Sequence, residues 1–100
     1  MVRTAFIVIR SPQELDPVET MHRLADRDDS TAILFEDGVY NALQPKRSAL
    51  IANAAADVIV AHDDLEARGF RESDLKVGKA ADYDQIIETI MERTERTVTI

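Results

Sequence analysis

The chain has 100 residues, no cysteine and a formal net charge of −7, and 45% of its residues are hydrophobic. This length predicts one domain over residues 1–100, and the composition indicates a cytoplasmic globular protein without a signal peptide or membrane span. The lack of cysteine excludes disulfides, thiolate metal sites and a cysteine nucleophile, and the acidic surface argues against direct nucleic-acid binding.

Apolar runs alternate with helix signals along the whole chain, in the order β-α-β-α-β-α-β-α-β. Residues 4–9 are apolar without alternation, which is typical of a strand covered on both faces. Asp16 and Pro17 then favour a helix start. Further strands are predicted at 31–35, 57–61 and 97–100, with at most a short strand at 75–77. The remaining helical segments are a turn at 39–43, a helix opening at Pro45, a short helix from Asp63 to Gly69, and a last helix from Asp82 with an apolar stripe of Tyr83, Ile86, Ile87, Ile90 and Met91.

This alternation of strands and helices predicts the α/β class. We expect a three-layer α/β/α sandwich with a mostly parallel five-stranded sheet. Ligands of such sheets bind beyond the carboxyl ends of the strands. The segments expected at that edge are Arg10–Asp16, Glu36–Tyr40 and Ala61–Asp64.

Polar residues at these strand ends allow two interpretations. Glu36, Asp37, His62 and Asp63 would form a ligand or metal site of a small enzyme domain. Alternatively, Asp37 caps the turn, Glu36 is solvated and His62 lies at the surface. Ser11 has no nucleophile-elbow context and is interpreted as a turn residue. None of the three glycines belongs to a phosphate-binding motif, and we predict neither a metal nor another cofactor.

Three segments together resemble the DsrH family, also called TusB. They are Arg10-Ser11-Pro12, the stretch from Leu34 to Leu43, and the stretch from Asp64 to Phe70, which is followed later by Asp82-Tyr83. The resemblance implies a DsrE/F/H-like fold and a place in a sulfur-relay complex with DsrE/TusD-like and DsrF/TusC-like subunits. Such complexes pass persulfide sulfur between protein thiols, in tRNA 2-thiouridine formation or in sulfur oxidation.

Some DsrH-type chains carry a cysteine in the first helix, at the position that aligns with Met21 here. A thioether cannot ionise to a thiolate and cannot hold a persulfide. We therefore expect a non-catalytic subunit of an oligomer, or a homo-oligomer outside the sulfur pathway. The candidate interface and loop residues are Ser11, Met21, Glu36, Asp37, Gly38, Tyr40 and Leu43.

The turn Glu36-Asp37-Gly38 has a specific expected role in the subunit interpretation. Asp37 would hold the loop by accepting hydrogen bonds from backbone amides, and Gly38 would adopt a dihedral unavailable to other residues. The turn would then deliver Val39, Tyr40 and Leu43 to a surface patch for a partner. The alternative is that these three side chains complete the core.

Overall fold

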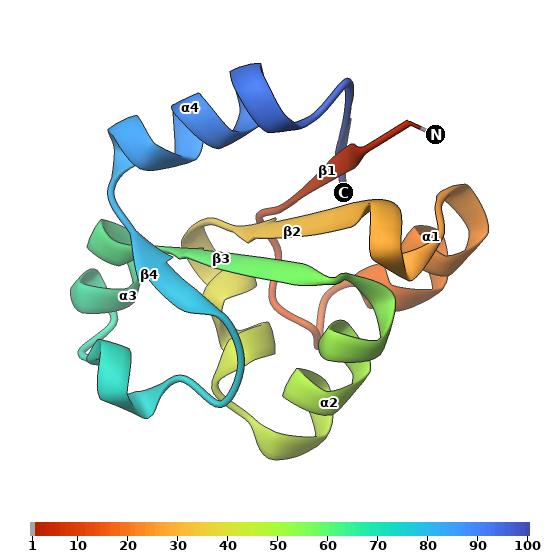
Figure 1. Ribbon diagram of the computed structural model, residues 1–100. Coiled ribbons are helices and arrows are strands. Elements are labelled where there is room, and N and C mark those ends of the chain that lie inside the picture. The colour runs from red at the N-terminus through yellow and green to blue at the C-terminus, as the bar shows by residue number, and fades with distance from the viewer. Residues whose placement is uncertain (1) are drawn as a thin grey trace.

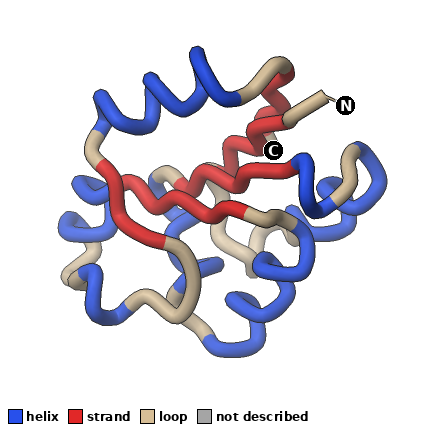
Figure 2. Tube along the Cα trace, viewed as in Figure 1, coloured by secondary structure: helices blue, strands red, loops and turns tan. Residues whose placement is uncertain are grey.

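In residues 2–100, which the computed structural model describes, five strands form one sheet in which all neighbours run parallel (Figures 1 and 2). The sheet order is β4-β3-β2-β1-β5. The fold is therefore of the predicted α/β class, with a sheet that is entirely parallel. The strands are β1 (Thr4–Val8), β2 (Ser30–Leu34), β3 (Asp57–Ala61), β4 (Lys79–Ala81) and β5 (Arg96–Thr99).

Helices cover the two faces of the sheet unequally (Figure 1). The α-helices are α1 (Pro17–Leu24), α2 (Pro45–Ala54), α3 (His62–Ala67) and α4 (Tyr83–Arg93), and the 3-10 helices are η1 (Arg27–Asp29), η2 (Glu36–Ala42) and η3 (Glu72–Asp74). Side chains from α1, α2, α3 and η2 pack on one face and form the larger core. On the other face, α4 contributes Ile86 to a smaller core.

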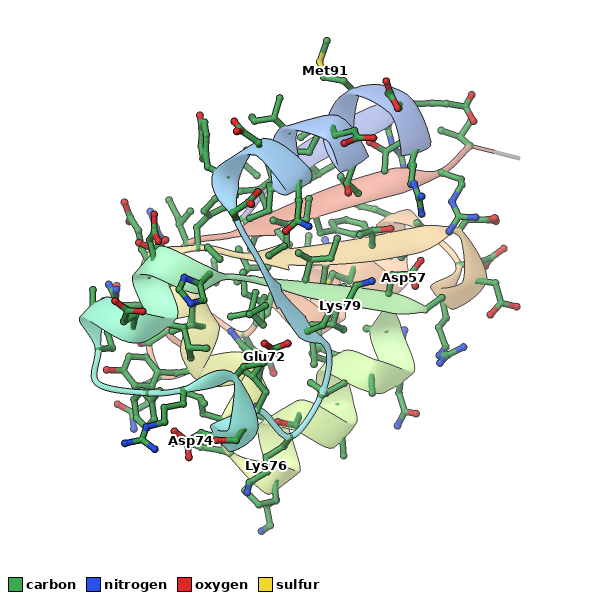
Figure 3. The ribbon with its side chains drawn as sticks, turned by 60° about the vertical axis from the view of Figure 1, so that its left-hand side comes forward. Asp57, Glu72, Asp74, Lys76, Lys79 and Met91 are labelled. Carbon is green, nitrogen blue, oxygen red and sulfur yellow. The ribbon has the colours of Figure 1, made fainter. Side chains whose placement is uncertain are left out.

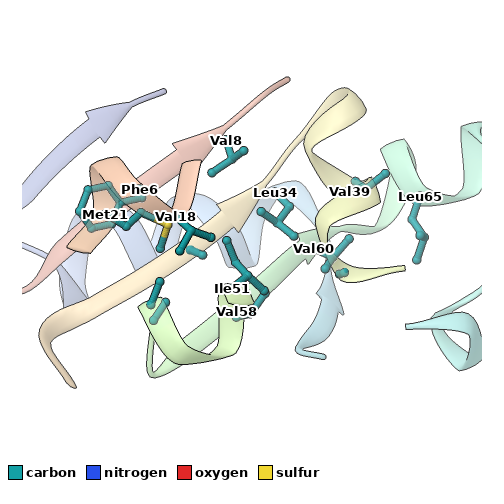
Figure 4. Packing of buried hydrophobic residues seen from close by; sticks show 14 residues of the cluster. Phe6, Val8, Val18, Met21, Leu34, Val39, Ile51, Val58, Val60 and Leu65 are labelled. Atoms are coloured by element: carbon teal, nitrogen blue, oxygen red, sulfur yellow. The ribbon is translucent and has the colours of Figure 1, made fainter. Parts of the chain in front are cut away.

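The larger core consists of apolar side chains from the central strands and the helices above them (Figure 4). Phe6 of β1 and Leu34 of β2 are fully buried there, as are Met21 of α1 and Ile51 of α2. Each large apolar side chain buried in this way contributes about 1.5–3 kcal/mol of transfer free energy. This core fixes the positions of the loops that leave the carboxyl ends of the strands.

Two helices begin as their sequence signals indicate. The Asp16 side chain accepts a hydrogen bond from the Val18 amide at 3.0 Å, and Pro17 occupies the first position of α1. At the start of α4, Asp82 and Gln85 form a reciprocal capping box with bonds of 2.8 and 3.0 Å. Both caps satisfy amides that have no partner within their own helix.

The short strand predicted at 75–77 is instead a loop, and β4 follows Gly78. Residues 79–81 pair with β3 in register, Ile59 opposite Lys79 and Ala61 opposite Ala81. Leu75 and Val77 are half-buried and pack against the larger core as loop residues. The apolar character of residues 75–77 therefore reflects packing under a loop rather than strand pairing.

The apolar stripe predicted on the last helix is only partly buried. Ile86 is fully buried and Ile90 packs beside it on the smaller core. In contrast, Tyr83, Ile87 and Met91 are 64%, 40% and 77% exposed. Figure 3 shows Met91 pointing away from the sheet. The outer side of α4 is therefore apolar and uncovered in the isolated chain.

Candidate functional site

The carboxyl ends of β2 and β3 lie side by side, and the segments that follow them are joined by polar contacts. The backbone amide of Glu36 donates to the Asp64 carboxylate of α3 at 2.7 Å. The Asp37 carboxylate accepts a hydrogen bond from Arg68 Nε at 3.0 Å, and Arg68 Nη2 forms an ion pair with the same oxygen at 2.9 Å. Arg68 also donates to the Asp64 carbonyl at 3.1 Å. One arginine thus ties η2 to the C-terminal end of α3.

The roles of the first two turn residues differ from those expected. Asp64, rather than Asp37, is the carboxylate that accepts from a loop amide. Asp37 neutralises a half-buried arginine instead. Glu36 is exposed and has a φ of 50°, a left-handed conformation that costs a residue other than glycine about 1–2 kcal/mol. The left-handed dihedral angle expected at Gly38 is therefore found at Glu36, two residues earlier in the chain.

Gly38 is required for a close approach of two backbones. The φ of Gly38 lies outside the left-handed region, whereas Gly69 and Gly78 have φ values of 83° and 75°. A Cβ atom at Gly38 would lie 2.0 Å from the carbonyl oxygen of Val8 at the end of β1. That same oxygen accepts a hydrogen bond from the Phe35 amide at 2.9 Å. Gly38 thus lets η2 pack directly on the exit of β1.

The apolar residues after the turn divide between core and surface. Val39 is fully buried in the larger core, as the alternative interpretation predicted. Leu43 is half-buried against the same core. Tyr40 is half-buried and packs edge-on against Phe70, with ring centroids 6.1 Å apart. Tyr40 and Leu43 are therefore the apolar side chains of this turn that remain partly exposed.

Ser11 and Met21 lie beyond the end of β1 and within α1. The Ser11 carbonyl accepts from the amides of Glu14 and Leu15 at 3.1 and 3.2 Å, which makes Ser11 a turn residue. Met21 is 0% exposed and contributes to the larger core. Its side chain therefore contacts the sheet and cannot reach a partner at the surface, in contrast to its expected place among the interface candidates.

The carboxyl group of Asp16, at the start of α1, has a lowered pKa. Partial burial would raise the pKa of its carboxyl group, but the Val18 amide and the Arg47 guanidinium outweigh that effect and hold the pKa below its usual value. The Arg47 Nη2 lies 2.7 Å from the Asp16 Oδ1. This ion pair joins the start of α1 to the first turn of α2 and has a structural role.

The four residues of the alternative ligand site do not converge. His62 lies between Asp63, with Nδ1 3.4 Å from the carboxylate, and Glu66, with Nε2 at 3.6 Å. His62 and Asp63 line a shallow hollow of about 280 Å³, whereas Glu36 and Asp37 do not. Within residues 2–100, no three side chains of metal-binding type come close enough to hold an ion. These four side chains therefore do not form one ion-binding cluster within the described residues.

A larger groove, of about 1050 Å³, lies beside α4 over β3 and β4, where no candidate was predicted. Its charged lining residues are Arg3, Arg27, Asp57, Lys79, Glu88 and Arg93, and these define the α4 groove. Figure 3 shows Asp57 and Lys79 on this side of the sheet. A sequence signal for it exists, since Gln85, Thr89 and Arg93 recur every four residues and form a polar ridge along one flank of α4.

Comparisons with known proteins agree with this fold. The family model described as DsrH like protein matches residues 10–96 of the chain. The solution NMR structure of protein Tm0979 from Thermotoga maritima is similar, with a TM-score of 0.60 and 26% sequence identity. That match covers 87% of this chain and 91% of Tm0979. A search of the curated proteins gave no match. In the part of the chain that the structure describes, each helix is too short or too polar to cross a bilayer.

Proposed function

Because the chain belongs to the DsrH-like family, we propose that it is a non-catalytic subunit of a sulfur-relay complex of the DsrEFH or TusBCD type. The observation that carries this proposal is the absence of any cysteine from the sequence. Persulfide transfer requires a thiolate to accept and release sulfur. A cysteine-free chain contributes to such a pathway through its surfaces, while the reactive thiols belong to its partners.

The proposed partners are DsrE/TusD-like and DsrF/TusC-like chains in the cytoplasm, and the pathway is tRNA 2-thiouridine formation or sulfur oxidation. The chain itself binds no nucleic acid directly, since its net charge of −7 repels phosphate groups. Its contribution is to complete an interface and to position a partner's cysteine. Tyr40 and Leu43 supply the partly exposed apolar surface of that interface.

The buried position of Met21 supports a structural role. In the alignment that the family resemblance implies, Met21 occupies the place of a cysteine. Here that place is 0% exposed and packed within the larger core. A side chain at this position stabilises the attachment of α1 to the sheet and has no access to a sulfur donor.

Sulfur loading provides the first test. The purified chain is incubated with a cysteine desulfurase and ³⁵S-labelled cysteine, and protein-bound label is measured after gel filtration. We expect no label on this chain, and label on a cysteine-bearing partner treated in the same way as the positive control. Stable labelling of the isolated chain would overturn the assignment of a non-catalytic role.

Affinity purification from the native host provides the second test. We expect chains of the same family that carry cysteine to be recovered with the tagged protein. Tyr40→Ala should reduce that recovery, whereas Leu50→Ala, on the exposed side of α2, should not. Thermal unfolding of both variants separates loss of the surface from loss of the fold. Recovery of the tagged chain alone would contradict the proposal.

A further inference from the structure

The α4 groove gathers basic side chains from an otherwise acidic chain. Four of the 12 lysines and arginines line it, but only two of the 19 aspartates and glutamates. The lining therefore carries a formal charge of +2 in a chain whose net charge is −7. At an ionic strength of about 0.15 M, charges act over roughly 8 Å, so a small ligand in the groove experiences this local charge rather than the net charge.

The four basic residues come from four segments that meet at one edge of the sheet. All strands run parallel, so their amino-terminal ends share that edge. Arg3 directly precedes β1, Arg27 lies in η1 before β2, and Lys79 is the first residue of β4. Arg93 ends α4, which runs from the carboxyl end of β4 back to the amino end of β5 (Figure 1). Neighbouring strands are about 4.8 Å apart and β4 lies three strands from β1, so the cations form a row of roughly 14 Å rather than one compact cluster.

Two of the arginines in this row are held in place by the protein. Arg3 Nη2 donates to the Asp57 carboxylate at 3.4 Å. Arg27 Nε donates to the Ala52 carbonyl at 2.9 Å, and its Nη1 donates to the Asp28 carboxylate at 3.2 Å. A guanidinium has five N–H donors, so each arginine keeps donors for a ligand after these bonds are made. Both side chains are therefore donors that are positioned before a ligand binds.

Lys79 and Arg93 add positive charge that no carboxylate balances. Within residues 2–100, neither forms an ion pair. Gln85 adds a neutral donor, because its Oε1 accepts from the Asp82 amide at 3.0 Å and its NH2 group is what it offers to the groove. Glu88 is a lining carboxylate that belongs to none of the ion pairs among these residues. The unpaired charges of the lining are thus two positive and one negative.

The geometry points to a binding site for an oligophosphate, meaning a chain of linked phosphate groups as in inorganic tripolyphosphate or a nucleoside triphosphate. Guanidinium groups bind phosphate oxygens through paired N–H donors, and a lysine adds a point charge. A row of cations matches a row of phosphate groups, whereas a single phosphate would contact only part of the row. The groove volume of about 1050 Å³ is also sufficient for a nucleotide, since small-molecule pockets are about 300–1,000 Å³.

A small oligophosphate matches the groove better than a nucleic acid does. The ridge of α4 next to the lining residues carries the exposed carboxylates of Asp84 and Glu92. A polynucleotide backbone would extend beyond the groove and meet these charges. The inference goes beyond the proposed function, because the groove lies at the amino-terminal edge of the sheet and the turn assigned to a partner lies at the carboxyl edge. Binding to the isolated chain requires no sulfur-relay partner, so its failure would leave the proposed function unaffected.

Isothermal titration calorimetry of the full chain tests this site, with tripolyphosphate, ATP, orthophosphate and adenosine as probes and without divalent cations. We expect tripolyphosphate to bind with a Kd below about 1 mM at about 50 mM NaCl, and about tenfold more tightly than orthophosphate. Its affinity should fall about tenfold when NaCl rises to about 500 mM, because salt screens exposed charges. ATP binding that is tighter than tripolyphosphate binding would assign the site to nucleotides, and equal binding would assign it to the phosphate chain alone. Adenosine should not bind.

Charge-neutralising variants locate the site. Lys79→Gln with Arg93→Gln should weaken tripolyphosphate binding about tenfold or more, and Glu88→Gln should strengthen it, because it removes a like charge from the lining. The matched control is Arg10→Gln with Lys46→Gln, which removes one arginine and one lysine that are exposed outside the groove and should leave the affinity within about twofold.

Circular dichroism verifies that every variant is folded. The inference is overturned if tripolyphosphate does not bind the wild type, or if orthophosphate binds as tightly. It is also overturned if the Lys79 and Arg93 double variant keeps the wild-type affinity, if Glu88→Gln weakens binding, or if a single-stranded oligonucleotide binds more tightly than tripolyphosphate.

Discussion

Replacing Gly38 with alanine tests the steric account of the turn after β2. The new Cβ would lie 2.0 Å from the Val8 carbonyl oxygen and 2.7 Å from its carbonyl carbon. Favourable carbon contacts begin at about 3.5 Å, so the backbones must separate by more than about 1 Å. The Val8 oxygen cannot move alone, because it holds the hydrogen bond from the Phe35 amide.

The magnitude follows from these two contacts. Overpacking of a core costs about 1–3 kcal/mol, and the strained Phe35–Val8 hydrogen bond adds about 1 kcal/mol. We expect Gly38→Ala to lower the free energy of unfolding by about 3 kcal/mol. For a domain of this size, that loss corresponds to a fall of about 12–24 °C in Tm.

Urea and thermal unfolding, followed by circular dichroism, measure the loss of stability. The control is Gly69, which has a left-handed φ but open space around it, whereas Gly38 is sterically crowded. Gly69 has a φ of 83°, and a Cβ added there would meet no atom within 4 Å, so Gly69→Ala introduces dihedral strain alone, about 1–2 kcal/mol. Asparagine tolerates the left-handed region better than alanine. We therefore expect Gly69→Asn to be more stable than Gly69→Ala, and Gly38→Asn to be no better than Gly38→Ala. A smaller loss for Gly38→Ala than for Gly69→Ala would refute the steric reasoning.

Three further substitutions test the loop contacts, the buried methionine and a helix cap. Arg68→Ala removes the hydrogen bond and the ion pair with Asp37 and should lower the free energy of urea unfolding by about 1 kcal/mol. Met21→Cys places the only thiol of the chain at a 0% exposed position, so the thiol reagent DTNB should react with it only after unfolding. The smaller side chain should also cost about 1–2 kcal/mol. Asp16 has a pKa below its value in the unfolded chain, so its carboxylate stabilises the fold above about pH 4 and progressively less below it. Asp16→Asn should therefore lower Tm at about pH 7 and have little effect at about pH 2.

Matched control variants show whether each effect is specific to the contact or position that the substitution changes. Arg23→Ala removes an ion pair with Glu19 that is 3.6 Å long and highly exposed, and should change stability little. Tyr83→Cys places a thiol at a 64% exposed position and should react with DTNB at once. Rapid labelling of Met21→Cys in the folded chain, an Arg68→Ala variant as stable as Arg23→Ala, or an Asp16→Asn effect that persists at low pH would contradict the respective argument.

The sequence alone determined the class of fold, the order of its elements and the family. The apolar runs at β1, β2 and β3 predict buried strands, and the capping residues Asp16 and Asp82 mark the starts of α1 and α4, as the structure confirms. These features depend on residues within about four positions of one another, so local pattern is sufficient to reveal them. The resemblance to DsrH rests on short segments of the same kind and is confirmed by the family match over residues 10–96.

Only the tertiary structure decided what the turn residues and the faces of α4 do. Asp37 pairs with an arginine 31 positions away, and Gly38 is needed because β1, distant in sequence, passes next to it. Strand β4 exists because the edge of β3 offers free hydrogen-bonding groups, although its own residues Lys-Ala-Ala carry no strand pattern. The exposed side of α4 is likewise set by how many helices share that face of the sheet. Each of these outcomes depends on contacts between segments far apart in the chain, which no local pattern encodes.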